Sequence, residues 1–281
     1  MLDVSIAPAP ARGAPFEEHV EWARNAPATP VTPATMPVSF ADTPAGDDIV
    51  VDPQPWDYEA LAREAVSASR HGVLDIGTGD GSAFVALGPL PERSAATGNG
   101  PAFLAARRRL EPLGVNVQKV EEVWADELML PFFDGQFGTV ISRCGLVSAT
   151  EVARVLEPGG VFVTEQFDTR DGFAINDALG VPLGWDPDGM TVDVLADGLK
   201  AEGLEVTRSE HHAGVRRFTS LGALLWYLKL APWQVPDLAQ LAPGAVAAHE
   251  AGLRGLHMQF AAGTELVDEA PRILVTAQKP V

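Results

Sequence analysis

Residues 73–81 read Val-Leu-Asp-Ile-Gly-Thr-Gly-Asp-Gly, and this short segment constrains the fold more than any other. Its apolar start predicts a buried strand with Asp75 near its end. The alternating glycines of Gly77–Gly81 predict a tight loop, because glycine lets the backbone turn sharply and approach a ligand closely. Ser82 then begins a predicted helix, whose N-terminal amides would face the same ligand. The segment therefore predicts a strand, a ligand-binding loop and a helix, in that order.

From Trp56 onward, helical and strand patterns alternate, which is typical of βαβ units on a parallel sheet. Apolar runs such as 137–141 and 160–164 are typical of strands buried on both faces. We expect an α/β protein with a doubly wound, mostly parallel seven-stranded sheet. Strands are expected at 72–76, 94–97, 115–120, 137–142, 160–167, 204–211 and 272–278, the last pairing with the strand before it. Helices are expected at 56–70, 82–87, 101–113, 148–156, 171–180, 192–203 and 220–230.

The first 55 residues form a proline-rich N-terminal extension, since ten of the 23 prolines lie before Trp56. Such a segment cannot be a continuous helix or a central strand. One helical piece, residues 16–25, interrupts it. We expect residues 1–55 to form an arm that acts as a lid or docking segment, with a loosely attached tail as the alternative. Residues 56–281 are expected to form the main domain, with a helical cover at about 171–256.

Charge and composition narrow the functional classes. A net charge of −18 repels phosphate backbones, so we expect no nucleic-acid partner. No run of about 18 apolar residues could span a bilayer, and the first residues do not form a secretory signal. The single cysteine, Cys144, excludes an internal disulfide and agrees with a reducing compartment. The six histidines form no cluster at metal-binding spacing. We expect a cytoplasmic protein without a membrane anchor or a metal.

A glycine-rich loop alone also fits a dinucleotide-binding Rossmann enzyme. The acid before the glycines favours a different family, and two further motifs follow in order. Residues 123–137 contain Leu-Pro-Phe-Phe-Asp-Gly-Gln-Phe, and residues 151–165 contain Arg-Val-Leu-Glu-Pro-Gly-Gly before an apolar strand. With these motifs the chain resembles the class I S-adenosylmethionine (SAM)-dependent methyltransferases, especially those acting on small molecules. The resemblance covers roughly residues 56–166 and implies a Rossmann-like fold that binds SAM.

The resemblance assigns the cofactor residues. It places Gly77 and Gly79 at the methionine and ribose end of SAM, and Asp75 at the ligand amine and the loop. Asp126 would accept a hydrogen bond from the adenine amino group, with a turn cap as its alternative role. Asn99 would lie beside the ribose.

The sequence departs from the family pattern at the ribose. An acid normally ends the second strand and binds both ribose hydroxyls, but Gly98 stands at that place and Asn99 follows it. Losing a charge-assisted bidentate contact costs about 1.5–3 kcal/mol if nothing replaces it. A second departure, Gly138 in place of the usual aspartate, is interpreted as structural.

Candidate catalytic residues follow from position. Asp80 in the loop and Glu165 at the end of the fifth strand are candidate bases, and Arg143 just after the fourth strand would face the substrate. The pair His211 and His212 could titrate near neutrality. Each has a structural alternative: solvation or a polar contact for the acids, an ion pair for Arg143, and an exposed strand edge for the histidines.

An aromatic segment at 225–233 would either line the binding site of an apolar acceptor or belong to the core.

Together these features predict SAM-dependent methyl transfer to a small organic molecule of secondary metabolism. Two alternatives remain open. The fold could serve a non-methylating reaction such as cyclisation, elimination or rearrangement, or the chain could be a non-catalytic binding subunit. A homo-oligomer or a partner protein bound through the N-terminal arm is also compatible with the sequence.

Overall fold

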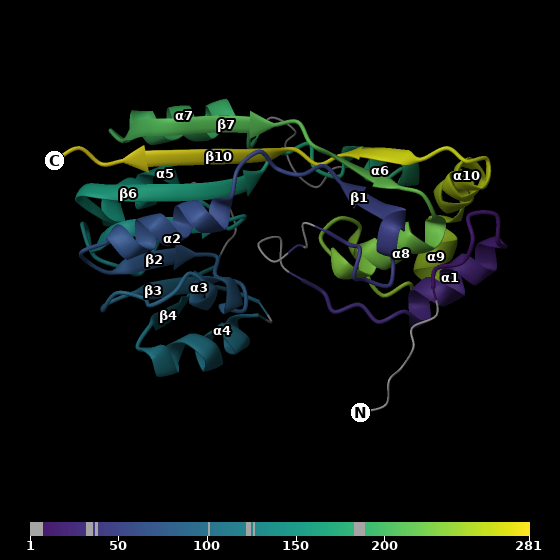
Figure 1. Ribbon diagram of the computed structural model, residues 1–281, viewed down its shortest axis with the longest axis horizontal. Coiled ribbons are helices and arrows are strands. Elements are labelled where there is room, and N and C mark those ends of the chain that lie inside the picture. The colour runs from purple at the N-terminus through teal and green to yellow at the C-terminus, as the bar shows by residue number, and fades with distance from the viewer. Residues whose placement is uncertain are drawn as a thin grey trace.

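The computed structural model describes residues 8–31, 36, 39–100, 102–121, 125, 127–182 and 189–281. Its helices and strands form two side-by-side lobes (Figure 1). The large lobe contains a seven-stranded sheet with helices on both faces. The small lobe consists of the described residues within 8–51, 172–182 and 214–270, and contains a three-stranded sheet with its own helices.

The seven-stranded sheet confirms the predicted architecture. Its strand order is β4-β3-β2-β5-β6-β10-β7. The first five strands in this order run parallel, whereas β10 is antiparallel to both of its neighbours. The strands are β2 (Val73–Ile76), β3 (Ala95–Gly98), β4 (Asn116–Lys119), β5 (Phe137–Arg143), β6 (Leu156–Phe167), β7 (Glu205–His212) and β10 (Arg272–Gln278).

Alternate strand residues feed two separate cores, as expected for a sheet buried on both faces. On one face, Leu74 and Val140 pack with helices α5 (Ala149–Val155) and α7 (Val192–Ala201). On the other face, Val73 and Ile141 pack with three helices. These are α2 (Tyr58–Ala68), α3 (Ser82–Ala86) and α4 (Phe103–Leu110), the last followed by the short 3-10 helix η3 (Glu111–Leu113).

The small lobe contains strands and helices that the sequence did not predict. Its antiparallel sheet has the order β1-β8-β9, from β1 (Ile49–Val51), β8 (Val215–Phe218) and β9 (Leu266–Glu269). The 3-10 turns η2 (Gly46–Asp48) and η4 (Pro236–Leu238) complete it. The helices around the sheet are α1 (Phe16–Asn25), α6 (Phe173–Leu179), α8 (Leu221–Leu230), α9 (Pro243–Ala248) and α10 (Glu250–Ala261).

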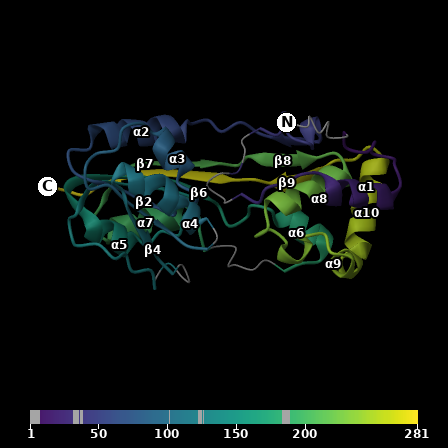
Figure 2. The same cartoon turned by 90° about the horizontal axis from the view of Figure 1, so that it is seen from below.

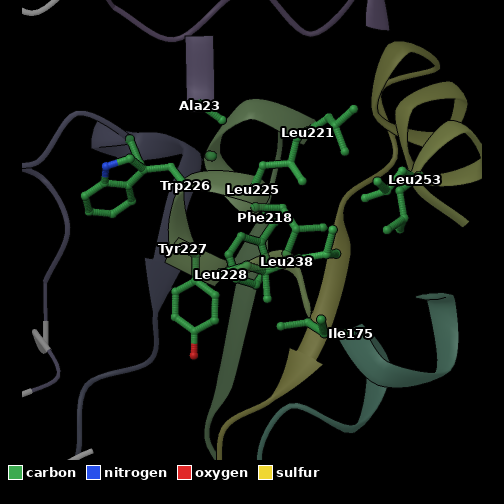
Figure 3. Packing of buried hydrophobic residues seen from close by; sticks show 14 of the residues in the cluster. Ala23, Ile175, Phe218, Leu221, Leu225, Trp226, Tyr227, Leu228, Leu238 and Leu253 are labelled. Atoms are coloured by element: carbon green, nitrogen blue, oxygen red, sulfur yellow. The ribbon is translucent and has the colours of Figure 1, made fainter. Parts of the chain in front are cut away.

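Helix α8 is the centre of the small-lobe core (Figure 3). It is buried almost all round, which is typical of a core helix and not of an amphipathic surface helix. Trp226 and Tyr227 lie in this core, so they do not form the wall of an exposed acceptor site. The Trp226 indole N–H donates to the carbonyl oxygen of Pro27 at 2.8 Å. This bond satisfies the polar atom of a buried ring.

The described residues among the first 51 belong to this lobe. Helix α1 packs against α8, and β1 pairs with β8. The Lys229 ammonium donates to the carbonyl oxygens of Ala23 and Ala26, both at 2.7 Å, and so satisfies carbonyls at the end of α1. The buried His19 Nδ1 accepts from the backbone N–H of Gly222 at 3.2 Å. These contacts join segments 203 residues apart in the sequence.

One antiparallel ribbon connects the lobes (Figure 2). Strands β7 and β10 pair in the large sheet, and their continuations β8 and β9 pair in the small one. Between them, the Ala270 N–H donates to the Gly214 carbonyl oxygen at 2.9 Å. Buried charges lie at the same junction: Asp171 accepts from Arg216 at 3.0 Å and from Arg272 at 2.5 Å. Within the described residues, no helix is long and apolar enough to cross a membrane.

Candidate functional site

The glycine loop has the geometry that its sequence predicts. Gly77, Gly79 and Gly81 have φ values of +74°, +61° and +79°, in the region that favours glycine. A Cβ on Gly77 would lie 2.7 Å from the Cα of Gly145, so no larger residue fits without a shift. Thr97 on β3 anchors the loop: its hydroxyl accepts from the Gly77 N–H at 3.1 Å. The loop is therefore held close to the carboxyl ends of β2 and β3.

Asp75 lies at this edge with its carboxylate buried. Burial raises the pKa of Asp75 to about 6, because desolvation disfavours the charged form. The Thr78 hydroxyl opposes that rise in pKa, yet it is buried and makes no hydrogen bond of standard geometry within the described structure. A carboxylate and a hydroxyl with unused capacity fit a ligand that brings hydrogen-bond donors and positive charge.

Strand β3 ends without the carboxylate that the family pattern places there. Gly98 closes β3, and a Cβ there would lie 3.8 Å from the ring of Phe103 and 3.9 Å from the methyl group of Thr78, both ordinary contacts. A larger side chain at position 98 is therefore sterically possible. Asn99 follows and is exposed. The ribose end of a SAM molecule would meet the Asn99 amide and backbone groups here, in place of a carboxylate.

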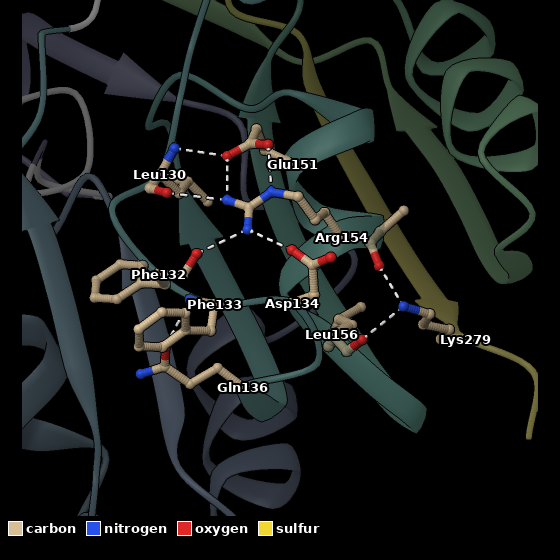
Figure 4. A network of polar contacts seen from close by, with 10 residues as sticks. Leu130, Phe132, Phe133, Asp134, Gln136, Glu151, Arg154, Leu156 and Lys279 are labelled. Carbon is tan, nitrogen blue, oxygen red and sulfur yellow. Dashed lines mark hydrogen bonds and ion pairs between the residues drawn. The ribbon is translucent and has the colours of Figure 1, made fainter.

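Asp126, the predicted adenine contact, lies outside the residues that the structure describes. The segment that follows it is described and is held by Arg154 of α5 (Figure 4). The guanidinium donates to the carbonyl oxygens of Leu130 and Phe132 at 2.9 and 2.7 Å. It also pairs with Glu151 at 2.7 Å, and Glu151 accepts from the Leu130 N–H at 2.6 Å. These side chains fix the backbone of the Leu-Pro-Phe-Phe motif against the sheet.

Arg143, Glu165 and Trp56 form a second group at the ends of β5 and β6. Glu165 is almost fully buried, and its two oxygens accept from the Arg143 Nε at 3.0 Å and from the Trp56 indole N–H at 2.7 Å. Arg143 also lies 3.6 Å from the Glu59 carboxylate and 5.6 Å from the centre of the Tyr58 ring. Burial opposes the charge on Arg143, but the Glu165 carboxylate raises the pKa of Arg143 on balance. Glu165 therefore orients two neighbours.

Asp80 has other partners. Its carboxylate accepts from the Ser82 N–H at 2.9 Å, at the start of α3, and pairs with Arg109 at 2.6 Å. Although burial raises the pKa of Asp80, the hydrogen bonds from Ser82 and Arg109 lower it on balance. The structure thus brings Arg143 and Glu165 together and places Asp80 in the loop scaffold.

Two cavities meet at the carboxyl edge of the sheet. The smaller, of about 30 Å³, is lined by residues of the glycine loop and α3 together with Asp75. The larger, of about 420 Å³, lies where the two lobes meet and falls in the size range of small-molecule sites. Tyr58, Glu59 and Arg143 line both cavities. This shared wall makes the two cavities neighbours.

Cys144 follows Arg143 and lines the larger cavity. Its φ of +56° is unusual for a residue with a side chain, and such backbone strain is concentrated at functional sites. Burial raises the pKa of the Cys144 thiol to about 12, so it is not a thiolate nucleophile at neutral pH.

The predicted histidine pair lies outside the two cavities. His211 lies 3.5 Å from Asp168, and the ring of His212 packs edge-on against Trp56 with centroids 6.2 Å apart. Neither is among the described residues that line the two cavities. Over all the residues that the structure describes, no group of three or more His, Cys, Asp or Glu is arranged to hold a metal ion.

The sequence reasoning missed Trp56, Tyr58 and Glu59 as site residues. They follow the proline-rich extension, and no motif marks them. The available signal was Asp57, which caps α2 by accepting from the Ala60 N–H at 2.9 Å. A capped helix start that carries two aromatic rings and a carboxylate indicates a candidate binding residue in this turn.

Comparison with solved structures agrees with this architecture. No family model matches the sequence, and no curated protein sequence matches it significantly. The chain is similar to BH2331 of Bacillus halodurans C-125, described as a candidate methyltransferase, with 17% identity, 80% of this chain and 99% of that chain covered, and a TM-score of 0.53. It is also similar to YcgJ of Bacillus subtilis, with 17% identity, coverage of 80% and 98%, and a TM-score of 0.51.

A third structure, the [4+2]-cyclase SpnF, is 20% identical, with 79% of this chain and 80% of that chain covered and a TM-score of 0.48. Identities this low bear on the fold alone. Together with the strand order, the first two similarities show that the chain has the Rossmann-like fold of the class I SAM-dependent methyltransferases.

Proposed function

We propose that the protein transfers a methyl group from SAM to a small organic molecule of secondary metabolism in the cavity between the lobes. The observation that carries this proposal is the shared wall of the two cavities. Tyr58, Glu59 and Arg143 line both the space beside the glycine loop and the larger space beyond it. A donor bound at the glycine loop and an acceptor in the larger cavity would be neighbours, as a direct group transfer requires.

The residues at the glycine loop fit the methionine end of SAM. Asp75 would accept from the ligand ammonium group, Gly77 and Gly79 would allow close approach, and Asn99 would take one ribose hydroxyl. Asp126 would accept from the adenine amino group. When bound, SAM supplies a methyl group already activated on a sulfonium. Because the pKa of Asp75 is about 6, we expect cofactor binding to weaken as the pH falls below that value.

The proposed roles of the three candidate catalytic residues follow from their contacts. Arg143 lines both cavities and would shape the wall between donor and acceptor. Glu165 would position Arg143 and Trp56, since both of its oxygens already accept hydrogen bonds from them. Asp80 would act indirectly, by holding the glycine loop through Ser82 and Arg109. Positioning supplies most of the rate in such a reaction, so the proposal needs no strong base.

Calorimetric titration with SAM and with S-adenosylhomocysteine tests the cofactor part of the proposal. We expect binding of both ligands, and loss of binding in the Asp75→Asn variant with its circular dichroism spectrum unchanged. The Asp237→Asn variant, at an exposed acid of the small lobe, serves as the matched control and should bind like the wild type. No heat and no thermal shift at millimolar ligand would overturn the proposal.

Methyl-labelled SAM tests the transfer itself. Incubation with an extract of small metabolites should move the label into a small-molecule fraction. A label that stays on the cofactor while the extract is still converted would contradict methyl transfer and favour a non-methylating reaction.

A further inference from the structure

The larger cavity has three aromatic residues in its lining. Trp56, Tyr58 and Phe167 contribute rings from three places: the segment before α2, its first turn, and the end of β6. The Trp56 ring is fixed by its hydrogen bond to Glu165, and the Phe167 ring has Arg272 stacked 3.9 Å from its centre. This part of the lining is apolar and held in place by these contacts, which suits a compact organic molecule.

Most of the charged groups around this cavity have a partner of opposite charge. Arg143 pairs with Glu165 at 3.0 Å. Arg272 donates to Asp171 at 2.5 Å and to the Pro271 carbonyl oxygen at 2.8 Å. Asp52 accepts from Arg217 at 2.7 Å. These pairs contribute little net charge to the cavity.

Two carboxylates remain in excess, both at the start of α2. Asp57 uses one oxygen to cap the helix and forms no ion pair with any described residue. Glu59 has only the 3.6 Å contact with Arg143, whose closer partner is Glu165, and its side chain is 57% exposed. Glu59 also belongs to the wall shared by the two cavities. The cavity therefore combines aromatic faces with an excess of negative charge.

We propose that this cavity binds an organic cation, an ammonium group on a small apolar body, with Glu59 as the residue that selects for the charge. Arg143 and Arg272 already lie over the rings of Tyr58 and Phe167, which leaves the Trp56 ring for a ligand. An aromatic ring attracts a cation through its quadrupole, and the Glu59 carboxylate adds to that attraction. The overall charge of −18 favours the approach of a cation in the same way. As a statement about the methyl acceptor, the inference rests on the proposed function; as a statement about the cavity, it stands without SAM.

Three probes of similar shape test the charge preference: benzyltrimethylammonium, benzyl alcohol and benzoate, each titrated by isothermal calorimetry at low salt. We expect the cation to bind at least about tenfold more tightly than the neutral probe, and benzoate to bind most weakly. Equal affinities, or tighter binding of benzoate, would overturn the inference.

Two variants on one helix locate the effect. Glu59→Gln should lower the affinity for the cation about tenfold and leave that for benzyl alcohol unchanged. Glu64→Gln, at an exposed position of α2 outside the cavity lining, should change neither affinity. If both variants lower the affinity equally, the cation responds to the general surface charge and the cavity assignment is wrong.

Saturating S-adenosylhomocysteine separates this inference from the proposed function. The cation should still bind when that ligand is present, because it occupies the neighbouring cavity. Displacement of the cation would place it in the cofactor site and overturn the inference. A protein that binds the cation but neither SAM nor S-adenosylhomocysteine would instead lose the proposed function and keep this cavity.

Discussion

The two lobes are organised on opposite principles. The large lobe takes its parallel strands in nearly unbroken sequence and places its polar side chains at one edge of the sheet. The small lobe is assembled from three distant segments and joins Lys229 to Ala23 and Trp226 to Pro27. The cavity of about 420 Å³ lies between them, with lining from both. In this molecule the large lobe supplies the edge with the polar side chains, and the small lobe closes the space in front of it.

The largest expected effect tests whether the lobes are one folding unit. Phe218→Ala in the small-lobe core and Phe162→Ala in the large sheet both remove a fully buried ring, at a cost of about 3–5 kcal/mol each. Because the shared ribbon and the pairs around Asp171 connect the lobes, we expect either variant to shift a single urea transition by the same amount.

Hydrogen exchange followed by mass spectrometry checks this expectation segment by segment. If Phe218→Ala accelerates exchange only in α8 and β8, and Phe162→Ala only in the large sheet, the lobes unfold independently and the contrast between them is also thermodynamic.

A smaller effect concerns the segment held by Arg154. Arg154→Ala removes the donor that pairs with the Glu151 carboxylate and with two backbone carbonyl oxygens. We expect it to destabilise the large lobe by roughly 1–3 kcal/mol. The affinity for SAM should fall with it, since the segment follows Asp126. Calorimetry and thermal unfolding measure the two effects.

Arg107→Ala is the matched control. Arg107 pairs with Glu111 on an exposed face of α4, where such pairs contribute about 1 kcal/mol or less. If the two arginine variants behave alike, the contacts of Arg154 with the Leu-Pro-Phe-Phe motif carry no special weight.

A third prediction concerns position 98, where the ribose-binding acid of the family is replaced by glycine. Gly98→Asp restores a carboxylate at the end of β3, where a side chain has room. We expect the affinity for SAM to rise about ten- to hundredfold, the equivalent of about 1.5–3 kcal/mol. Gly98→Asn, of the same shape without the charge, should produce a smaller gain in the same titration. An unchanged affinity with aspartate would mean that SAM is not bound with its ribose at this strand end.

The sequence predicted the large lobe because its signals are local. The runs at 137–141 and 160–164 are apolar enough to be buried on both faces, and both are strands. The boundary of β6 was wrong by four residues, since Leu156 already pairs with Phe137 across an irregularity in the ladder. Strands β1, β8 and β9 were missed although β2, β3 and β4 are equally short, because no motif or alternation with predicted helices marks them. Their partners lie far away in the chain: Ile49 pairs with Phe218.

The predictions of the site residues divide in the same way. Asp75 and the glycines were found because one continuous motif carries them, and the pairing of Arg143 with Glu165 agrees with the ion pair considered for the arginine. Trp56 and Glu59 were not found. Their place at the cavity depends on how α2 crosses the sheet edge, and no local pattern of residues encodes that contact.

The smallest predicted effect gives the two lobes opposite responses to acid, through one buried group in each. In the small lobe, burial is the main cause that lowers the pKa of His19, and the nearby His257 lowers it further. The unfolded chain therefore gains a proton below pH 6.5 while the folded chain resists it, so His19 makes the protein less stable as the pH falls. In the large lobe, the raised pKa of Asp75, about 6, has the reverse sign. Between pH 6 and 4 the folded state holds a proton that the unfolded state has lost, so Asp75 makes the protein more stable as the pH falls.

Each response amounts to at most about 1.4 kcal/mol per pH unit, so it has to be measured as a difference between wild type and variant. His19→Asn keeps an acceptor for the Gly222 N–H without a titrating ring, and should remove part of the destabilisation seen in urea titrations between pH 7 and 5. Asp75→Asn should change the pH dependence in the opposite direction, in urea titrations between pH 6 and 4. If both variants alter the pH dependence with one sign, the burial of one of the two groups is not maintained in solution. The lobe that contains that group is then open to water. The contrast between the closed core of the small lobe and the polar edge of the large sheet does not hold for that lobe.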